Sequence, residues 1–352
     1  MTATLGGTAT RHPISPVHDG IVAAIGATPM VRLDRLFRTV PTSVLAKVER
    51  ANPGGSTKDR PAREMVEAAL AEGRAVPGVT TIVESSSGNL GVALALACAY
   101  HRLGLHVVSD PKASHTNLAI MRALGARVEI VTERDLATGE FLPTRLLRVQ
   151  ELLTSIPGAL CLDQYNNPSG AAAHRRTARE IVDAIGEPDV LFVAAGSCGS
   201  LRGIADHLRS SGAHTRIVAV DACGSAIFGS MAPPAPDYGR TLPGHGSTMV
   251  PGHFRDDLAD DVVFVTDAEC VAACRMLAER EAILAGGSSG AVIAAIAAYL
   301  PRLPAGSTVV TILPDGGDRY LHSIYDDAWV QNHIGLPAVL AASTRLEELL
   351  RR

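Results

Sequence analysis

Residues 189–212 read DVLFVAAGSCGSLRGIADHLRSSG, and this one stretch contains a complete strand–loop–helix unit. The apolar run 189–195 predicts a buried strand, 196–200 a loop of small residues, and 201–212 a helix that stops at a glycine. The loop consists of Gly196, Ser197, Cys198, Gly199 and Ser200, and it places five backbone N–H groups at the positive end of that helix. It is neither G-x-G-x-x-G nor a P-loop, so dinucleotide and ATP sites are not expected. Its composition fits a phosphate cradle and, equally, a tight turn.

The same alternation of strand and helix runs through most of the chain. Apolar strands with little polar alternation are predicted at 44–49, 80–85, 106–110, 127–131, 189–195, 216–222 and 308–315. Helices are predicted at 59–73, 90–104, 116–125, 201–212, 268–281 and 289–300. Strands of this kind, separated by helices, indicate parallel sheets that are covered on both faces. We therefore expect an α/β protein with two doubly wound parallel-sheet lobes.

Turn residues in LCLDQYNNPSG (160–170) mark the expected join between the lobes. The predicted organisation is a flexible arm at 1–20, a smaller N-terminal lobe at 51–162, a larger lobe formed by 21–50 with 163–332, and a C-terminal helical tail at 333–352. Ligands in open parallel sheets bind beyond the carboxyl ends of the strands, so the loops at those ends are the candidate site.

Composition excludes several classes of function. A net charge of −4 over 352 residues gives no reason to expect nucleic acid or an acidic membrane as a partner. There is no apolar run long enough for a membrane span, and the first residues lack the apolar core of a signal peptide. The six cysteines form no C-x-x-C pair and the twelve histidines no H-E-x-x-H pattern, so we expect a reduced, cytoplasmic chain without a catalytic metal.

Two further loops resemble the first in composition. ESSSGN (84–89) lies between a predicted strand and a nearly all-apolar helix, and its amides and hydroxyls suit a carboxylate or another anion. GGSSG (286–290) also precedes a helix. An ordinary helix N-cap is the simpler interpretation of the second loop and an alternative for the first.

Lysine is rare in this chain, which has only Lys47, Lys58 and Lys112. Lys58 lies in NPGGSTKDRPA (52–62), at the start of a predicted helix, where the helix dipole does not favour a positive charge. A lysine in such a place suits Schiff-base chemistry, which needs a lowered pKa and a pocket. A phosphate-bearing aldehyde would satisfy both this lysine and the cradle at 196–200, and that cofactor is pyridoxal 5′-phosphate.

Several motifs together resemble the cysteine synthase-like, fold-type II pyridoxal-phosphate enzymes. They are IGATPMVRL (25–33), NPGGSTKDRPA (52–62), ESSSGNLG (84–91), MRALGARVEIV (121–131), GSCGS (196–200), LAGGSSG (284–290) and LPDGGDRYL (313–321). The resemblance covers about 21–330 and implies a tryptophan synthase β-like fold, a small lobe with a mobile part, and a homodimer.

The resemblance also assigns roles to individual residues. It implies that Lys58 holds the cofactor as an imine, that Asn89 bonds its phenolic oxygen, and that Ser288 faces its pyridine nitrogen. The loop 196–200 corresponds to the family's phosphate loop. The positions that bind the substrate's α-carboxylate correspond here to Ser86 and Ser87, and Gln164 corresponds to a glutamine near that carboxylate. Ser85 is also expected among the substrate-binding residues.

The chain departs from cysteine synthases at Leu90, Ser197, Cys198 and Tyr165, all at the expected site. With FLPTRLLRVQELL (141–153), DQYNNP (163–168) and DACGSAIFG (221–229), it looks most similar to the N-(2-amino-2-carboxyethyl)-L-glutamate synthases. That family joins O-phospho-L-serine to L-glutamate, towards 2,3-diaminopropionate for siderophores or peptide antibiotics. An amino-acid acceptor with a second carboxylate needs a cation or several donors, and Arg145 is the candidate. The Tyr165 hydroxyl could contact either the acceptor or the leaving phosphate. For Arg145, a solvated helix arginine is the equally weighted alternative.

Three other functions stay open at this point. One is a cysteine or cystathionine synthase, with O-acetylserine or O-phosphoserine as donor and a sulfur nucleophile. A dehydratase fits GGSTKDR less well, because the resemblance gives that form of the lysine motif to the synthases. The third belongs to a different class, a non-catalytic protein that keeps the fold and binds another protein.

Overall fold

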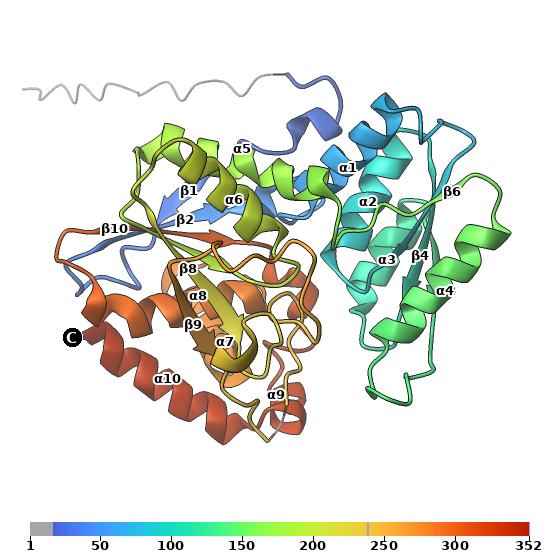
Figure 1. Cartoon of the computed structure of the whole chain (residues 1–352). Coiled ribbons are helices and arrows are strands. Elements are labelled where there is room, and N and C mark those ends of the chain that lie inside the picture. The colour runs from blue at the N-terminus through green and yellow to red at the C-terminus, as the bar shows by residue number, and fades with distance from the viewer. Residues whose placement is uncertain (1–16, 238, 352) are drawn as a thin grey trace, which may run out of the picture.

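The computed structural model describes residues 17–237 and 239–351 of the chain, with ten α-helices and ten strands in that part. It forms two lobes side by side, each built around its own sheet (Figure 1). Most of the predicted arm 1–20 lies outside the described residues. No helix in the described part has both the length and the apolarity that a membrane crossing requires.

The larger lobe contains a six-stranded sheet in the order β1-β2-β10-β7-β8-β9. Its strands are β1 (Met30–Arg32), β2 (Ser43–Val48), β7 (Val190–Ala194), β8 (Arg216–Ala222), β9 (Asp261–Val265) and β10 (Thr308–Leu313). All neighbours in this sheet are parallel except β1, which runs antiparallel to β2. The N-terminal strands thus belong to the sheet that the C-terminal half builds.

Helices cover both faces of this sheet. They are α5 (Pro168–Ile185), α6 (Gly199–Ser210), α7 (Asp267–Glu281), α8 (Gly287–Tyr299), α9 (Asp327–His333) and α10 (Leu336–Arg351). Helix α8 is apolar on every side, and all but one of its thirteen residues are buried, because it is enclosed by the sheet, α7 and α10. The predicted C-terminal helix is therefore present as α10, which closes one face of this core.

The smaller lobe contains a four-stranded parallel sheet in the order β5-β4-β3-β6. Its strands are β3 (Thr81–Ser85), β4 (Gly104–Ser109), β5 (Arg127–Ile130) and β6 (Ala159–Leu160). Its helices are α1 (Asp59–Ala71), α2 (Asn89–Tyr100), α3 (His115–Ala123) and α4 (Leu142–Ser155). Helix α2 is apolar all round and forms the centre of this lobe's core with α1 and the sheet.

Each predicted strand and helix corresponds to an element of the structure, with ends that differ by a few residues. The sequence analysis assigned no bounds to six α-helices and strands of the structure, which are α4, α5, α9, β1, β6 and β9. Helix α5 starts where Asn167 accepts a hydrogen bond from the Ser169 N–H and Pro168 takes the first helical position. This helix packs on α6 of the larger lobe and on α1 of the smaller lobe, so it joins the two.

Candidate active site

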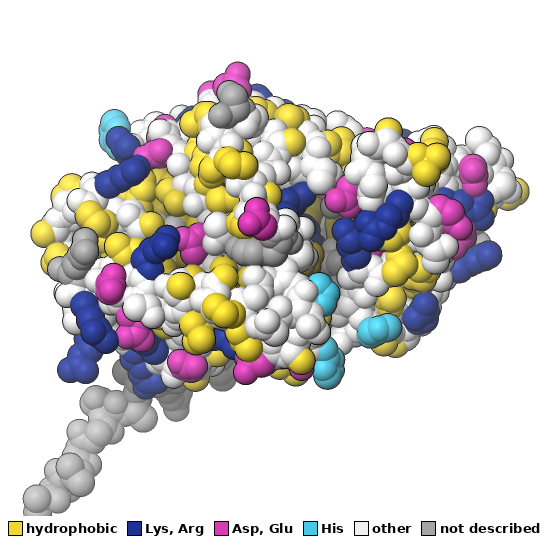
Figure 2. Space-filling view, turned by 90° about the horizontal axis from the view of Figure 1, so that it is seen from below, with side chains coloured by type: hydrophobic (Ala, Val, Ile, Leu, Met, Phe, Trp, Pro, Cys, Tyr) yellow, Lys and Arg dark blue, Asp and Glu magenta, His cyan; other side chains and the backbone are white. Residues whose placement is uncertain are grey.

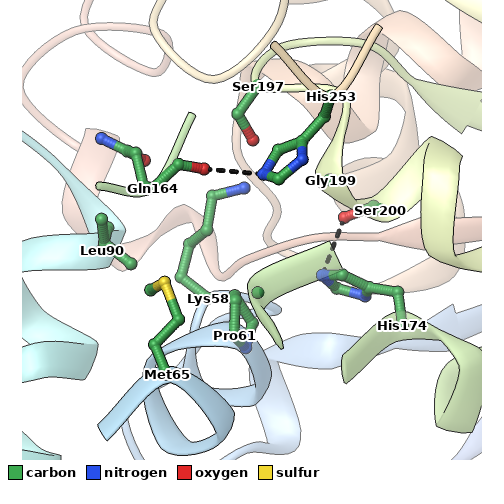
Figure 3. Close-up of a pocket in the computed structure, with 11 residues that line it drawn as sticks. Lys58, Pro61, Met65, Leu90, Gln164, His174, Ser197, Gly199, Ser200 and His253 are labelled. Carbon is green, nitrogen blue, oxygen red and sulfur yellow. Dashed lines mark hydrogen bonds between the residues drawn. The ribbon is translucent and has the colours of Figure 1, made fainter. Parts of the chain in front are cut away.

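A cavity lies where the two lobes meet. It is lined by α1, the start of α2, the turn at Gln164, helix α5, the loop 196–200 and His253 (Figure 3). Seen from below, the molecular surface is hollowed between the lobes, with Lys and Arg side chains beside the hollow (Figure 2). The loops that follow β3, β7 and β10 converge here, as expected for the carboxyl ends of parallel strands.

Lys58 projects its ε-amino group into this cavity from the N-cap position of α1 (Figure 3). The preceding turn is anchored to the end of β10, because Ser56 forms a bridge with Asp315 and the Thr57 N–H donates to the Pro314 carbonyl at 2.7 Å. The Lys58 ε-amino group has no hydrogen-bond or ion-pair partner in the described part of the chain. Burial lowers the pKa of Lys58, although the nearby Asp315 and Cys198 act in the opposite direction. A neutral amine is the form that attacks an aldehyde.

The other two lysines are engaged elsewhere. Lys47 lies in β2, is 1% exposed, and its ammonium group contacts Glu180 at 2.8 Å and the Thr28 carbonyl at 3.0 Å. Lys112 lies in a loop with 58% of its side chain exposed, 3.4 Å from Glu140. Lys58 is therefore the one lysine with a free, desolvated amine in a cavity.

The loop 196–200 presents unpaired donors to the same cavity. None of its five backbone N–H groups donates to a protein acceptor within residues 17–237 and 239–351. Cys198 has a φ of 60°, and this left-handed residue turns successive N–H groups towards one side at the start of α6. Buried donors without acceptors are costly, so the arrangement fits the phosphate of a bound cofactor.

His174 supports this loop from α5. Its Nε2 lies 3.1 Å from the Ser200 hydroxyl and its Nδ1 lies 3.2 Å from the Thr177 hydroxyl. The side chain is 1% exposed, and burial lowers the pKa of His174 well below its ordinary value. A neutral ring therefore fixes Ser200 from behind.

Asn89, at the first position of α2, is held between two residues of the larger lobe. Its Nδ2 donates to the buried Asp315 carboxylate at 2.7 Å, and its Oδ1 accepts from the Arg319 guanidinium. Asp315 also accepts from the Tyr320 hydroxyl at 2.6 Å, and burial raises its pKa. The amide of Asn89 thus has a fixed orientation, with one N–H left for a ligand.

The loop GGSSG forms the N-terminus of α8, as the simpler interpretation expects, although no side chain caps this helix. Gly286 is the N-cap of α8 and Ser288 is 5% exposed. A methyl group on Gly286 would lie 2.2 Å from Asp315 Oδ1, so glycine is required for this loop to approach Asp315. The loop's small residues serve close packing beside the site.

The loop ESSSGN lies against Gln164, whose Nε2 is 3.4 Å from the Ser85 carbonyl. Its helix, α2, has Gly88 as N-cap and no capping side chain. The Ser86 hydroxyl instead accepts from the Gly91 N–H at 2.9 Å. The hydroxyls of Ser85 and Ser87 have no protein partner in the described residues; Ser85 is buried and Ser87 is half-buried, so Ser87 is the more accessible of the two to a ligand.

Arg145 is buried, so the alternative of a solvated helix arginine is wrong. It is 8% exposed in α4, and its Nη1 lies 3.0 Å from Asp110 Oδ2. Its Nε and Nη1 make no hydrogen bond within the described residues. Burial raises the pKa of the half-buried Tyr165, and the positive charge of Arg145 acts in the opposite direction.

Sequence reasoning did not assign a role to four residues that the structure places at the site. Asp315 and Arg319 lie in the motif LPDGGDRYL, which supported the family resemblance without any function for either residue. His174 and His253 carry no sequence signal, because each is isolated and reaches the cavity only through the packing of distant segments.

These residues can hold pyridoxal 5′-phosphate, since an amine without a partner and an anion cradle line one cavity, and the amide donor Asn89 directly precedes Leu90 of that lining. A family model described as "Pyridoxal-phosphate dependent enzyme" matches residues 21–315. The chain belongs to this family of pyridoxal-phosphate dependent enzymes, and its fold is the fold-type II architecture.

Two curated relatives share the name N-(2-amino-2-carboxyethyl)-L-glutamate synthase. The one from Ralstonia nicotianae is 47% identical over 312 residues, which is 88% of this chain and 90% of the relative. The one from Cupriavidus metallidurans is 43% identical over 319 residues, which is 89% of this chain and 92% of the relative. These relatives and the family make the chain a pyridoxal-phosphate dependent enzyme, so a non-catalytic role is not supported.

Solved structures give the same fold. An O-acetylserine dependent cystathionine β-synthase from Helicobacter pylori is 33% identical, with a TM-score of 0.80 over 89% of this chain and 100% of its own. A cysteine synthase from Entamoeba histolytica is 29% identical, with a TM-score of 0.81 over 97% of this chain and 98% of its own.

Proposed function

We propose that the enzyme joins O-phospho-L-serine to L-glutamate, releasing phosphate and forming N-(2-amino-2-carboxyethyl)-L-glutamate. The main support is the pair of curated relatives with that activity in their name, at 47% and 43% identity over nearly the whole chain. In this product the glutamate nitrogen is bonded to the β-carbon of an alanine unit. The reaction is therefore a replacement at Cβ of the donor.

When bound, pyridoxal phosphate withdraws electrons from Cα of an amino acid, which makes the Cα proton removable and allows a group on Cβ to leave. Lys58 is placed to take that proton and to return it after the new bond has formed, because burial lowers the pKa of its amine and the amine has no partner in the described residues. The loop 196–200 holds the cofactor phosphate. Asn89 bonds the phenolic oxygen, in the orientation that Asp315 and Arg319 impose.

The donor's α-carboxylate binds to Ser86, Ser87 and Gln164, beside the start of α2. The smaller lobe comprises residues 51–162. Binding of the donor draws the mobile part of this lobe over the cavity, since closure of this kind excludes water from an active site. Ser288 faces the pyridine nitrogen. A neutral serine there gives a weaker electron sink than a carboxylate, and the weaker sink suffices because the leaving phosphate carries the electrons away.

The acceptor's side-chain carboxylate meets Arg145, with Tyr165 as a second donor. Support comes from the burial of Arg145 and from its N–H groups that lack hydrogen bonds. A carboxylate in a dry site needs such a partner. The ion pair with Asp110 already neutralises part of the charge of Arg145, so Arg145 orients the acceptor's carboxylate as well as attracting it.

A nucleophile screen tests the proposal. The purified enzyme is incubated with O-phosphoserine and, separately, with glutamate, other amino acids and sulfide, and products are identified by mass. Glutamate should give the adduct with stoichiometric phosphate. A much faster reaction with sulfide would make the enzyme a cysteine synthase, the function named for the Entamoeba histolytica structure. Replacing O-phosphoserine by O-acetylserine identifies the leaving group.

We also propose that the product leads to 2,3-diaminopropionate for a siderophore or peptide antibiotic, and that the enzyme is a cytoplasmic homodimer, as the family resemblance implies. Light scattering of the purified protein measures the oligomeric state. A mass near 36.7 kDa, that of one chain, would contradict the dimer.

A further inference from the structure

An amine acceptor makes a chemical demand that the residues described so far do not meet. The amino group of glutamate is mainly an ammonium ion at neutral pH, and it must lose a proton before its nitrogen can bond to carbon. Lys58 is occupied with the Cα proton at that stage. The proposed reaction therefore needs a second base in the same cavity.

Among the residues that line the cavity, the titratable groups are Lys58, His174 and His253. His174 is not available, because both of its ring nitrogens are within hydrogen-bond distance of hydroxyls, those of Ser200 and Thr177. His253 differs. Its Nε2 lies 3.0 Å from the carbonyl oxygen of Gln164, which can only accept, so Nε2 carries the hydrogen. The lone pair of the ring is then on Nδ1.

Nδ1 of His253 is buried and has no hydrogen-bond partner in the described residues, and the side chain is 1% exposed. Figure 3 shows the ring beside Ser197 and the Gln164 carbonyl, with the Lys58 ε-amino group pointing towards that pair. A buried acceptor without a partner is costly in a folded protein, so this nitrogen in the cavity lining needs a partner that the described residues do not supply.

The backbone holds this ring in place. A methyl group on Gly252 would lie 1.9 Å from Asn166 Oδ1, so the chain before His253 fits closely against the turn after Gln164. Burial lowers the pKa of His253; the charges of Arg202 and Lys58 act in the same direction, and the Gln164 hydrogen bond and Asp163 act against it. Burial thus favours the uncharged form of the ring.

We propose that His253 is the general base that deprotonates the acceptor's amino group. This rests on the proposed function. One proton moves from the glutamate ammonium to Nδ1 of His253, and the freed nitrogen lone pair forms the N–Cβ bond to the donor skeleton after phosphate has left. The electron pair that this addition releases takes up a proton at Cα, delivered by Lys58. His253 then returns its proton to water, and no oxidant or reductant is required.

The test separates a base from a residue that only supports Gln164. His253→Gln places an amide N–H where Nε2 was, so it retains a donor for the Gln164 carbonyl and removes the basic nitrogen. His207→Gln, on α6 and outside the cavity lining, is the matched control. Each protein is loaded with cofactor, and its visible absorbance gives the occupancy. Single-turnover phosphate release is measured with O-phosphoserine alone, and adduct formation after glutamate is added.

For His253→Gln we expect normal cofactor occupancy, normal phosphate release and adduct formation slowed by ~10²–10⁴-fold, the usual contribution of general base catalysis. The rate of adduct formation by His253→Gln should rise about tenfold per pH unit, because the fraction of glutamate with a free amine rises by that factor. The wild-type rate should not show this slope above the pKa of His253, because the histidine removes the proton. His207→Gln should match the wild type. Unchanged adduct formation in His253→Gln, or equal losses in both half-reactions, would overturn the proposal. A wild type that forms no glutamate adduct refutes the proposed function instead.

Discussion

The three lysines of this chain allow one comparison in which the structure predicts three different results. In cofactor-free protein, Lys58 has a desolvated amine without a partner, Lys47 is a buried ion pair, and Lys112 is an exposed one. Replacing each by methionine keeps the length and removes the charge. The free energy of unfolding is measured by urea denaturation of the cofactor-free proteins at one pH.

The expected magnitudes follow from these environments. Lys58→Met should stabilise by about 1–3 kcal/mol, because a buried polar group without a partner costs roughly that much. Lys47→Met leaves Glu180 without one of its buried partners and should destabilise by ~3–5 kcal/mol. Lys112→Met should change stability by less than about 1 kcal/mol, since its pair with Glu140 is exposed. Only Lys58→Met should lose the cofactor's visible absorbance and all turnover.

The pH dependence provides a second check. The pKa of Lys58 is lower in the folded protein than in the unfolded chain, so the unfolded chain binds more protons between the two values. Stability of the wild type therefore rises with pH in that window, up to the ordinary lysine pKa near ~10.4, and the advantage of Lys58→Met shrinks. A variant that is less stable than the wild type at neutral pH, or that retains turnover, would refute the reasoning.

Three other predictions follow from the site. Arg145→Ala should lower kcat/KM for glutamate by roughly 10–150-fold, the equivalent of a charged contact of about 1.5–3 kcal/mol. Phosphate release from O-phosphoserine alone should stay nearly intact. If that release is blocked, Arg145 binds the donor's phosphate instead. Asp315→Asn replaces the charged hydrogen-bond acceptor of Asn89 by a neutral one. An absorbance titration should then show a cofactor dissociation constant raised about fivefold, or about 1 kcal/mol. An unchanged constant would contradict the role of Asp315 in orienting Asn89. Burial raises the pKa of Glu84 to about 7, so the folded state binds the extra proton and wild-type stability falls as pH rises from 4.5 towards 7. Glu84→Gln should flatten that fall in thermal unfolding, and identical slopes for both proteins would contradict the assignment.

Part of the site was predictable from the sequence because its signals are local. The loop 196–200 follows an apolar strand and precedes a helix within 24 residues, so its unpaired amides can be placed without knowing the rest of the fold. Lys58 was singled out by its rarity and its place at a helix start. The helix that became α2 was recognised as nearly all apolar, and this character is a property of a single segment.

Tertiary structure decided which of these loops share a cavity and what holds them there. Asn89 meets Asp315 across 226 positions of sequence and His253 meets Gln164 across 89, and neither pair has a signature in its own neighbourhood. The burial of Arg145 depends on how α4 lies against the rest of its lobe, and periodicity does not specify this. The physical reason is that parallel strands need long crossover connections, so residues at their carboxyl ends are distant in sequence and adjacent only after the sheets have formed. The sequence by itself determined the repeating α/β elements and the chemistry of each loop; the packing of the two sheets determined which side chains face Lys58.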